Sequence, residues 1–173
     1  FRSSPVTNEL SFPHAATIRW KVPVRQTNET MEVFWYEGGI RPRTPDALIE
    51  KAGELPKEGV MFVGEKGIIL ADYGYGNLRL LGVKNADEIA ASIKAPQVNL
   101  INQTDEMVNS FKGGKPSRGD FVNAQTIAEA ICLGNLAIRV GRRLQWDEKN
   151  LKVANVLEAN QYVRRQYRQG WEL

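Results

Sequence analysis

The stretch ATIRWKVPVRQTNETMEVFWYEGG (residues 16–39) contains two runs of alternating apolar and polar residues joined by a polar loop. In residues 16–24 and again in residues 31–36, apolar side chains recur at every second position, which is the period of a half-buried β-strand. Pro23 favours an edge or a bulge near the end of the first strand. The pattern predicts an antiparallel hairpin, and its second strand could be covered on both faces.

A second hairpin is predicted further along the chain. Residues 60–63 and 68–72 are strand-like and flank the sequence GEKG. In it, Glu65 and Lys66 fit the centre of a tight turn, and Gly67 fits a left-handed position after the turn. The segment YGNLRLLG, which follows, predicts one more strand. These strands indicate an open, mainly antiparallel β-sheet.

The strongest helical signal lies in residues 121–140, where apolar side chains repeat every three to four positions. Leu133 and Leu136 widen this apolar stripe. The stripe predicts a helix that lies against the sheet and is largely buried. Gly141 is expected to end the helix as a left-handed cap.

Shorter helices are predicted elsewhere in the chain. Thr44, Asn85 and Thr104 are candidate helix caps, and a final helix is expected near residues 157–168. The fold class is therefore expected to be α+β, with an open, mainly antiparallel sheet and helices packed on one face. A length of 173 residues suits a single domain spanning residues 1–173.

The composition is that of a soluble globular protein, with 42% hydrophobic and 25% charged residues. No apolar run approaches the roughly 20 residues of a membrane-spanning helix, so no membrane partner is expected. Cys132 is the only cysteine, and we expect it to be a small buried residue. Residues 139–168 hold eight bases against three acids. An anionic partner is conceivable there, although a solvated basic helix face explains the same charge.

Two glycine-containing segments resemble nucleotide-binding motifs but fail the test for them. GYGNLR has Gly74 and Gly76, but Arg79 stands at the third glycine position, and strand-like residues follow where a helix is required. SFKGGKPS lacks the first glycine of a phosphate loop and has Pro116 where Ser or Thr would bind magnesium. No cofactor site is therefore expected in this chain.

His14, the only histidine, precedes the first predicted strand. A lone histidine cannot build a polyhistidine metal site, so no metal is expected. It has either a structural role or a hydrogen-bonding or proton-transfer role toward a substrate. Aromatic side chains such as Tyr73 could stack on a sugar ring, although aromatics on strands more often belong to a core or an interface.

The segment from FKGGKPSRGDFVNAQ to the end of the chain resembles the C-terminal region of the glucose-fructose oxidoreductase, inositol dehydrogenase and rhizopine-catabolism (Gfo/Idh/MocA) family. It is most similar to the bacterial branch that has a long C-terminal α/β domain. The most specific parts are GNLAIRVGRRLQWD and RRQYRQGWEL. VGEKGIILADYGYGNLRLL and FWYEGGIRP also look like that branch, so the resemblance covers nearly the whole chain.

The resemblance implies a two-domain parent enzyme. Its N-terminal Rossmann domain would bind NAD or NADP, and its C-terminal sheet would carry helices on one face while the other face often makes the oligomer interface. This chain would be the second domain without the first, in agreement with a sequence that begins at Phe1. The family's catalytic Lys of an E-K-P motif and its D-x-x-x-H pair have no match here, so the resemblance implies that the fragment alone does not turn over substrate.

The resemblance also implies a substrate-facing segment before the long helix. Relatives often read S-N-F-D-Y-A-G there, whereas this chain reads RGDFVNAQ, with Asn123 in place of the common tyrosine. Together with His14, the expected substrate-binding residues are Arg118, Asp120 and Asn123, because free amides at a helix start favour anionic or hydroxyl-rich ligands.

Three functional hypotheses follow. The leading one is the C-terminal domain of an NAD(P)-dependent sugar or cyclitol oxidoreductase, with the Rossmann domain, the substrate and a second copy of the chain as partners. The second is a stand-alone carbohydrate-binding or assembly module. The third, an anion or nucleic-acid binder that uses the basic C-terminal region, has no supporting motif, and no nucleic-acid partner is expected. A cytoplasmic and a periplasmic location both stay open.

Overall fold

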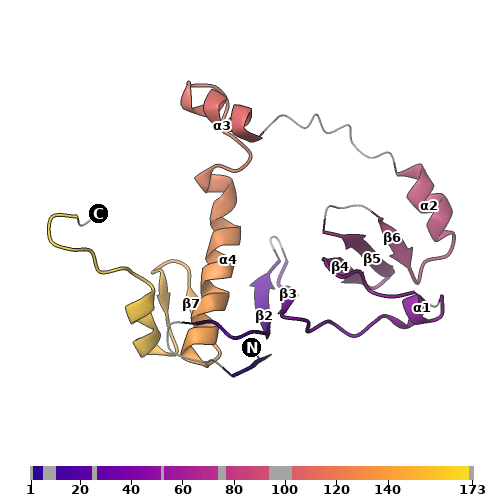
Figure 1. The fold of residues 1–173 in the computed structure, drawn as a ribbon, viewed down its shortest axis with the longest axis horizontal. Coiled ribbons are helices and arrows are strands. Elements are labelled where there is room, and N and C mark those ends of the chain that lie inside the picture. Colours follow the sequence, from indigo (N-terminus) through magenta and orange to yellow (C-terminus); the bar gives the residue numbers. More distant parts are fainter. Residues whose placement is uncertain are drawn as a thin grey trace. The chain divides into compact units, whose positions relative to one another are not determined.

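The computed structural model describes residues 2–5, 11–24, 27–51, 53–73, 77–93 and 103–171. These residues form a mixed α+β fold with small open antiparallel sheets and several helices (Figure 1). The predicted class is thus confirmed, with the strands divided among three sheets. The chain splits into two compact units, Phe1–Arg41 with Met107–Leu173 and Pro42–Glu106. The single-domain organisation stays a prediction.

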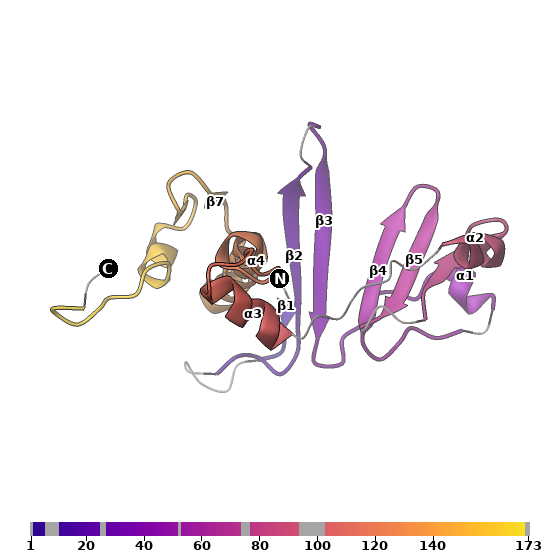
Figure 2. The ribbon, with the colours of Figure 1, turned by 90° about the horizontal axis from the view of Figure 1, so that it is seen from above.

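The first unit contains the sheet predicted from the opening stretch. Its strands are β1 (Arg2–Ser3), β2 (Ala16–Pro23) and β3 (Thr30–Glu37), in the order β1-β2-β3. The antiparallel hairpin of β2 and β3 is confirmed. The suggestion that β3 is covered on both faces is wrong, because every residue of β3 except Tyr36 is exposed. Both views show α4 on one side of β2 and β3 on the other (Figures 1 and 2).

Helix α4 (Phe121–Val140) begins and ends as the sequence predicts. The Asp120 carboxylate accepts a hydrogen bond from the Asn123 backbone N–H at 2.7 Å, and Gly141 ends the helix with φ +73°. Gly134 faces Ile18 and Trp20 of β2, and a Cβ at position 134 would lie only 2.7 Å from the Trp20 ring. Figure 2 shows α4 end-on beside strands that run across the view, so the helix crosses β2 steeply.

The opposite side of α4 packs on the C-terminal segment. Leu136 clusters with Val153, Val156 and Ala159. The elements of this segment are β7 (Trp146–Asp147), β8 (Lys152–Val153) and the 3₁₀-helix η1 (Leu157–Tyr162). Leu136 was expected to widen the sheet-facing stripe, but it lies two residues from Gly134, half a helical turn away. Helix α4 therefore has two apolar faces.

The final helix is shorter and tighter than predicted. A helix was expected near residues 157–168, and the structure has only the six residues of η1 there. The Asn160 side chain folds back to bond the N–H and the carbonyl of Val153. These bonds hold the segment in a tight turn against β8, so it does not continue as an α-helix.

The buried residues of α4 all lie in its C-terminal half. Gly134, Leu136 and Ile138 are buried, whereas Phe121 and Ile127 are 95% and 66% exposed. The expectation of a largely buried helix is wrong for the N-terminal half, because that half extends beyond the sheet (Figure 1). Cys132, expected to be buried, is also exposed.

The second unit holds the second hairpin. Its strands β4 (Gly59–Gly64), β5 (Gly67–Asp72) and β6 (Arg79–Leu81) form an antiparallel sheet, flanked by α1 (Asp46–Ile49) and α2 (Ala86–Ser92). Leu48, Leu70 and Leu81 form the core. The turn at Glu65 and Lys66 is confirmed.

The glycine after that turn and the predicted helix caps differ in detail. Gly67 has φ +151°, which is positive but not left-handed helical, and a Cβ there would meet Val83 at 2.4 Å. Helix α1 follows Pro45, one residue after Thr44, and Asn85 precedes α2 without a side-chain cap bond. Thr104 lies inside α3 (Gln103–Phe111).

Candidate functional site

Two of the four predicted substrate-binding residues form the start of α4. Asp120 caps the helix through the Asn123 N–H, so these residues are in direct contact. Arg118 lies two residues before the cap and is exposed, like Asn123. The Asp120 carboxylate already satisfies one helix amide, and the remaining first-turn amides and the positive dipole end favour anionic or hydroxyl-rich groups.

His14 does not join them. It is exposed and lies just before β2, whose Ala16 clusters with Ile138 near the other end of α4. Phe121 and Ile138 are seventeen residues apart, which corresponds to about 25 Å along an α-helix. The structure therefore places His14 at one end of α4 and the other three residues at the other end.

The second unit contains a shallow hollow that sequence reasoning did not identify as a site. Its volume is about 890 Å³, and it opens between the end of β5 and β6. The lining residues are Pro56, Lys57, Glu58, Asp72, Tyr73, Asn77, Leu78 and Arg79. The sequence analysis pointed to this region only through Tyr73, as an aromatic side chain that could stack on a sugar ring. Gly74 and Gly76, the glycines of the failed nucleotide motif, lie outside the described residues.

Polar contacts order one side of this hollow. The Asn77 side-chain amide donates to the Asp72 carboxylate at 2.5 Å, and an Arg79 guanidinium N–H donates to the Glu54 carbonyl at 3.5 Å. The Arg79 Nε is buried, and none of the described residues accepts its hydrogen bond. The strand β6 follows the glycines, as predicted, where a dinucleotide site would require a helix.

Two carboxylates elsewhere have shifted pKa values, and both serve structure. The hydrogen bond from Arg19 lowers the pKa of Glu32. The Lys21 ammonium, 3.6 Å from the Glu32 carboxylate, lowers this pKa further. The Asn150 side chain and backbone N–H lower the pKa of Asp147. Each bond is local to one strand pair or turn. Within the described ranges, no group of three or more His, Cys, Asp or Glu residues could hold a metal ion.

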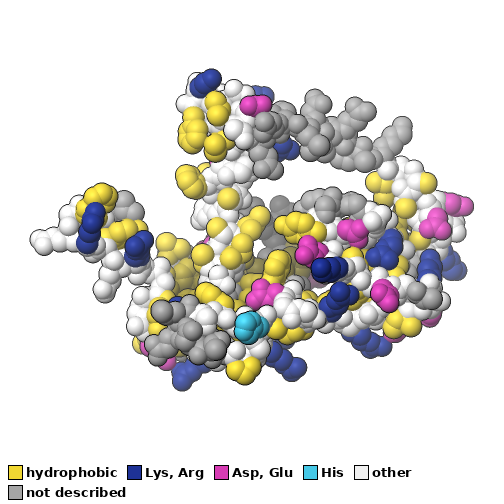
Figure 3. Space-filling model, viewed as in Figure 1, with side chains coloured by type: hydrophobic (Ala, Val, Ile, Leu, Met, Phe, Trp, Pro, Cys, Tyr) yellow, Lys and Arg dark blue, Asp and Glu magenta, His cyan; other side chains and the backbone are white. Residues whose placement is uncertain are grey.

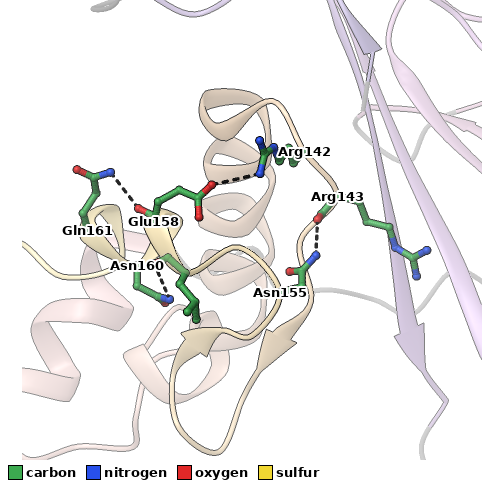
Figure 4. A network of polar contacts seen from close by, with 7 residues as sticks. Arg142, Arg143, Asn155, Glu158, Asn160 and Gln161 are labelled. Carbon is green, nitrogen blue, oxygen red and sulfur yellow. Dashed lines mark hydrogen bonds and ion pairs between the residues drawn. The ribbon is translucent and has the colours of Figure 1, made fainter.

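The basic C-terminal region uses part of its charge internally. Arg142 pairs with Glu158 at 3.2 Å, and the Asn155 side chain donates to the Arg143 carbonyl at 2.8 Å (Figure 4). Arg139 lies over the Tyr162 ring, and Arg168 lies 4.3 Å from the centre of the Trp171 ring. These contacts are consistent with a structural role for the cluster, and the absence of a nucleic-acid partner stays a prediction.

Helix α4 is long and apolar enough, by length and composition alone, to cross a membrane. Its covered half packs on β2 and on the C-terminal segment, as a core helix does. The expectation of no membrane partner stays a prediction.

Comparisons with models of protein families, with curated proteins and with solved structures found no match for this chain.

Proposed function

We propose that this chain is the C-terminal domain of an NAD(P)-dependent oxidoreductase of the Gfo/Idh/MocA type. In the complete enzyme it would shape the pocket for a sugar or cyclitol and would carry the oligomer interface. NAD or NADP, held by an N-terminal Rossmann domain, would supply the hydride chemistry. The residues of this chain would bind and orient the substrate and exclude water from it.

The observation that carries the proposal is the bare N-terminal half of α4. Phe121 and Val122 are 95% and 81% exposed, directly beside the capped helix start that holds Asp120 and Asn123. Large exposed apolar patches rimmed by polar residues are typical of interaction sites. A second domain resting on this half would enclose the helix start and turn an open surface into a pocket.

The segments that carry the resemblance support the same proposal. GNLAIRVG supplies Gly134, where α4 touches β2, and Gly141, which caps the helix. FWYEGG supplies Gly38, which has φ +67° and whose Cβ would lie 2.0 Å from the His14 carbonyl oxygen. These positions require glycine for close approach or for backbone conformation, so the resembling residues are the ones on which the fold depends.

The test uses the complete parent protein. Its reading frame should contain a strand followed by G-x-G-x-x-G upstream of Phe1, and its absence would refute the proposal. The purified parent should oxidise or reduce a sugar or cyclitol with NAD(P), followed by nicotinamide absorbance. Asn123→Ala should raise KM about tenfold at an unchanged melting temperature. Asn135→Ala, an exposed asparagine on the same helix, is the matched control.

A second candidate function, carbohydrate binding without catalysis, is favoured by the hollow in the second unit. Tyr73 is 75% exposed beside the Asp72–Asn77 pair, and such a combination of a ring face and planar polar groups suits a sugar. Calorimetric titration of the chain with neutral sugars tests it. Binding that Tyr73→Ala abolishes and Tyr167→Ala leaves intact would favour this module over the oxidoreductase domain.

A further inference from the structure

Arg79, the first residue of β6, is a half-buried cation without an anionic partner among the described residues. Its guanidinium makes one hydrogen bond to them, with the Glu54 carbonyl oxygen at 3.5 Å, which is long for such a bond. The Nε atom is buried and has no acceptor there. A guanidinium has five N–H donors, and leaving a buried donor unpaired is destabilising. An acceptor for these donors therefore has to come from outside this part of the chain.

Asp72 is the acidic neighbour that could have paired with Arg79. Arg79 is in register with Leu70, and Asp72 lies two residues further along β5. The side chains of Asp72 and Arg79 therefore project to the same face of the sheet, on a diagonal of roughly 7–8 Å. Asp72 instead accepts a hydrogen bond from the Asn77 amide at 2.5 Å. Both Asp72 and Arg79 line the hollow of the second unit, so it holds opposite charges that stay apart.

The other groups that line the hollow suit a sugar ring. Tyr73 is 75% exposed and offers a ring face for stacking. The carboxylates of Asp72 and Glu58 can accept hydrogen bonds from hydroxyl groups. The volume of about 890 Å³ has room for a monosaccharide. The hollow thus combines a ring face and hydroxyl acceptors with the guanidinium of Arg79.

The charge of this surface is mixed. Figure 3 shows basic (dark blue) and acidic (magenta) side chains interspersed over the second unit. In the lining of the hollow, two basic residues balance two acidic ones, Lys57 and Arg79 against Glu58 and Asp72. Opposite charges this close cancel at long range, so the surface does not attract anions in general. Selectivity for an anionic group therefore has to come from short-range pairing with Arg79.

We propose that the hollow binds a sugar acid, with the ligand carboxylate on Arg79 and the sugar ring on Tyr73. A carboxylate can take two parallel N–H bonds from a guanidinium, which a hydroxyl group cannot. Binding supplies the missing counter-charge, and Asp72 accepts from the sugar hydroxyls. The proposal deepens the carbohydrate-binding candidate function by naming its ligand class, and it rests on that function for the sugar ring.

Calorimetric titration of the complete chain with D-glucuronate and with D-glucuronamide tests the proposal. The two ligands share the ring and its hydroxyls, and only the first carries a negative charge. We expect the acid to bind at least about tenfold more tightly than the amide. D-galacturonate and its amide repeat the comparison with one hydroxyl inverted.

Two variants assign the effect to the guanidinium. Arg79→Lys keeps the positive charge but loses the planar donor fork, so it should remove most of the difference between acid and amide. Arg43→Lys is the matched control, because Arg43 pairs with Asp46 at 2.9 Å on the exposed surface of the same unit. This variant should bind the acid like the wild type. Circular dichroism verifies folding, and if Arg79→Lys does not fold, the wild-type comparison alone decides.

Three results would overturn the proposal. The first is equal affinity of the wild type for acid and amide, which would leave the carbohydrate-binding function standing because the neutral sugar still binds. The second is a difference between acid and amide that persists in full in Arg79→Lys. The third is no binding of any of the four ligands at millimolar concentration, which would also count against the carbohydrate-binding function. The oxidoreductase assignment depends on the parent-enzyme assay and is decided separately.

Discussion

The two halves of α4 are similarly apolar in sequence and opposite in surroundings. Ile131 and Ile138 lie on one stripe of the same helix, yet Ile138 is 8% exposed and Ile131 is 56% exposed. The difference arises because the apolar contacts of β2 and of the C-terminal segment gather at residues 134–138, whereas Ala130 and Glu129 accept hydrogen bonds from the Trp20 and Trp146 indoles. A periodic apolar pattern therefore locates the faces of a helix, while the length of each neighbouring element decides how much of a face is covered.

The largest expected effect follows from this pair of isoleucines. Ile138→Ala removes a side chain packed against Ala16 and Ile18 and should lower the free energy of unfolding by about 2–4 kcal/mol. Ile131→Ala, measured by urea denaturation at a concentration where the chain is monomeric, should change it by less than about 0.5 kcal/mol. Equal losses in the two variants would show that the whole stripe is covered within one chain.

Overpacking at the end of the covered half should have the next largest effect. Gly134→Val places a branched side chain where even a Cβ would lie 2.7 Å from Trp20 and 3.3 Å from Ile18, so we expect a loss of about 2–3 kcal/mol. Asn135→Val points to solvent and leaves helix propensity nearly unchanged, so it should stay within about 0.5 kcal/mol. Valine is a better helix former than glycine, so a loss in Gly134→Val would come from overpacking. Thermal unfolding of both variants measures the difference. A tolerated Gly134→Val would mean that α4 does not approach β2 this closely.

Local periodicity was enough to predict the hairpins and α4, because alternation and the 3.6-residue repeat are properties of short segments. Gly141 and the turn at Glu65 and Lys66 were also predictable, since their chemistry is local. What covers each element was not predictable. The exposure of β3, and the position of Leu136 on a second helix face, depend on contacts with residues distant in the sequence.

The candidate site shows the same limit. The helix start that joins Asp120 and Asn123 was predictable, because Asp120 directly precedes the helix-like run. The separation of His14 from it was not, because it depends on where along α4 the strand β2 crosses. The hollow near Tyr73 was missed because its polar groups show no motif spacing. Asp72 ends β5, Arg79 begins β6, and Asn77 lies in the connection between them.

The C-terminal segment, which covers the C-terminal half of α4, can be destabilised by a substitution outside the helix. Asn160 bonds the N–H and carbonyl of Val153, which is fully buried, at 2.8 and 3.0 Å. Asn160→Ala leaves both groups unpaired and should cost about 1–2 kcal/mol. Gln161→Ala removes an exposed 2.9 Å bond to the Glu158 carbonyl and should cost less than about 0.5 kcal/mol (Figure 4). Chemical denaturation of the pair tests whether the C-terminal segment depends on Asn160. Equal costs would show that it does not.

The smallest expected effect is a pH dependence of the stability of the C-terminal segment. Asp147 precedes the turn between β7 and β8, and two hydrogen bonds from Asn150 lower the pKa of its carboxyl in the folded protein. A lowered folded-state pKa stabilises the protein above the ordinary aspartate pKa of about 3.9, and the contribution is lost as the pH falls through the folded-state value. Asp147→Asn should therefore lower the unfolding midpoint at neutral pH, and the difference from the wild type should vanish in acid.

The Asn150→Ala background provides the control, since it removes the side-chain bond and keeps the backbone bond of residue 150, so Asp147→Asn should then have a smaller effect. A midpoint difference of the same size at neutral and at acidic pH would show that the charge of Asp147 contributes nothing to the segment. If the difference in unfolding midpoint follows the predicted pH profile, acid destabilises the C-terminal segment that packs on Leu136. The first two turns of α4, where Phe121 and Ile127 are exposed, lie outside this cover in the described part of the chain, so their hydrogen exchange should be the same at both pH values once intrinsic exchange rates are corrected.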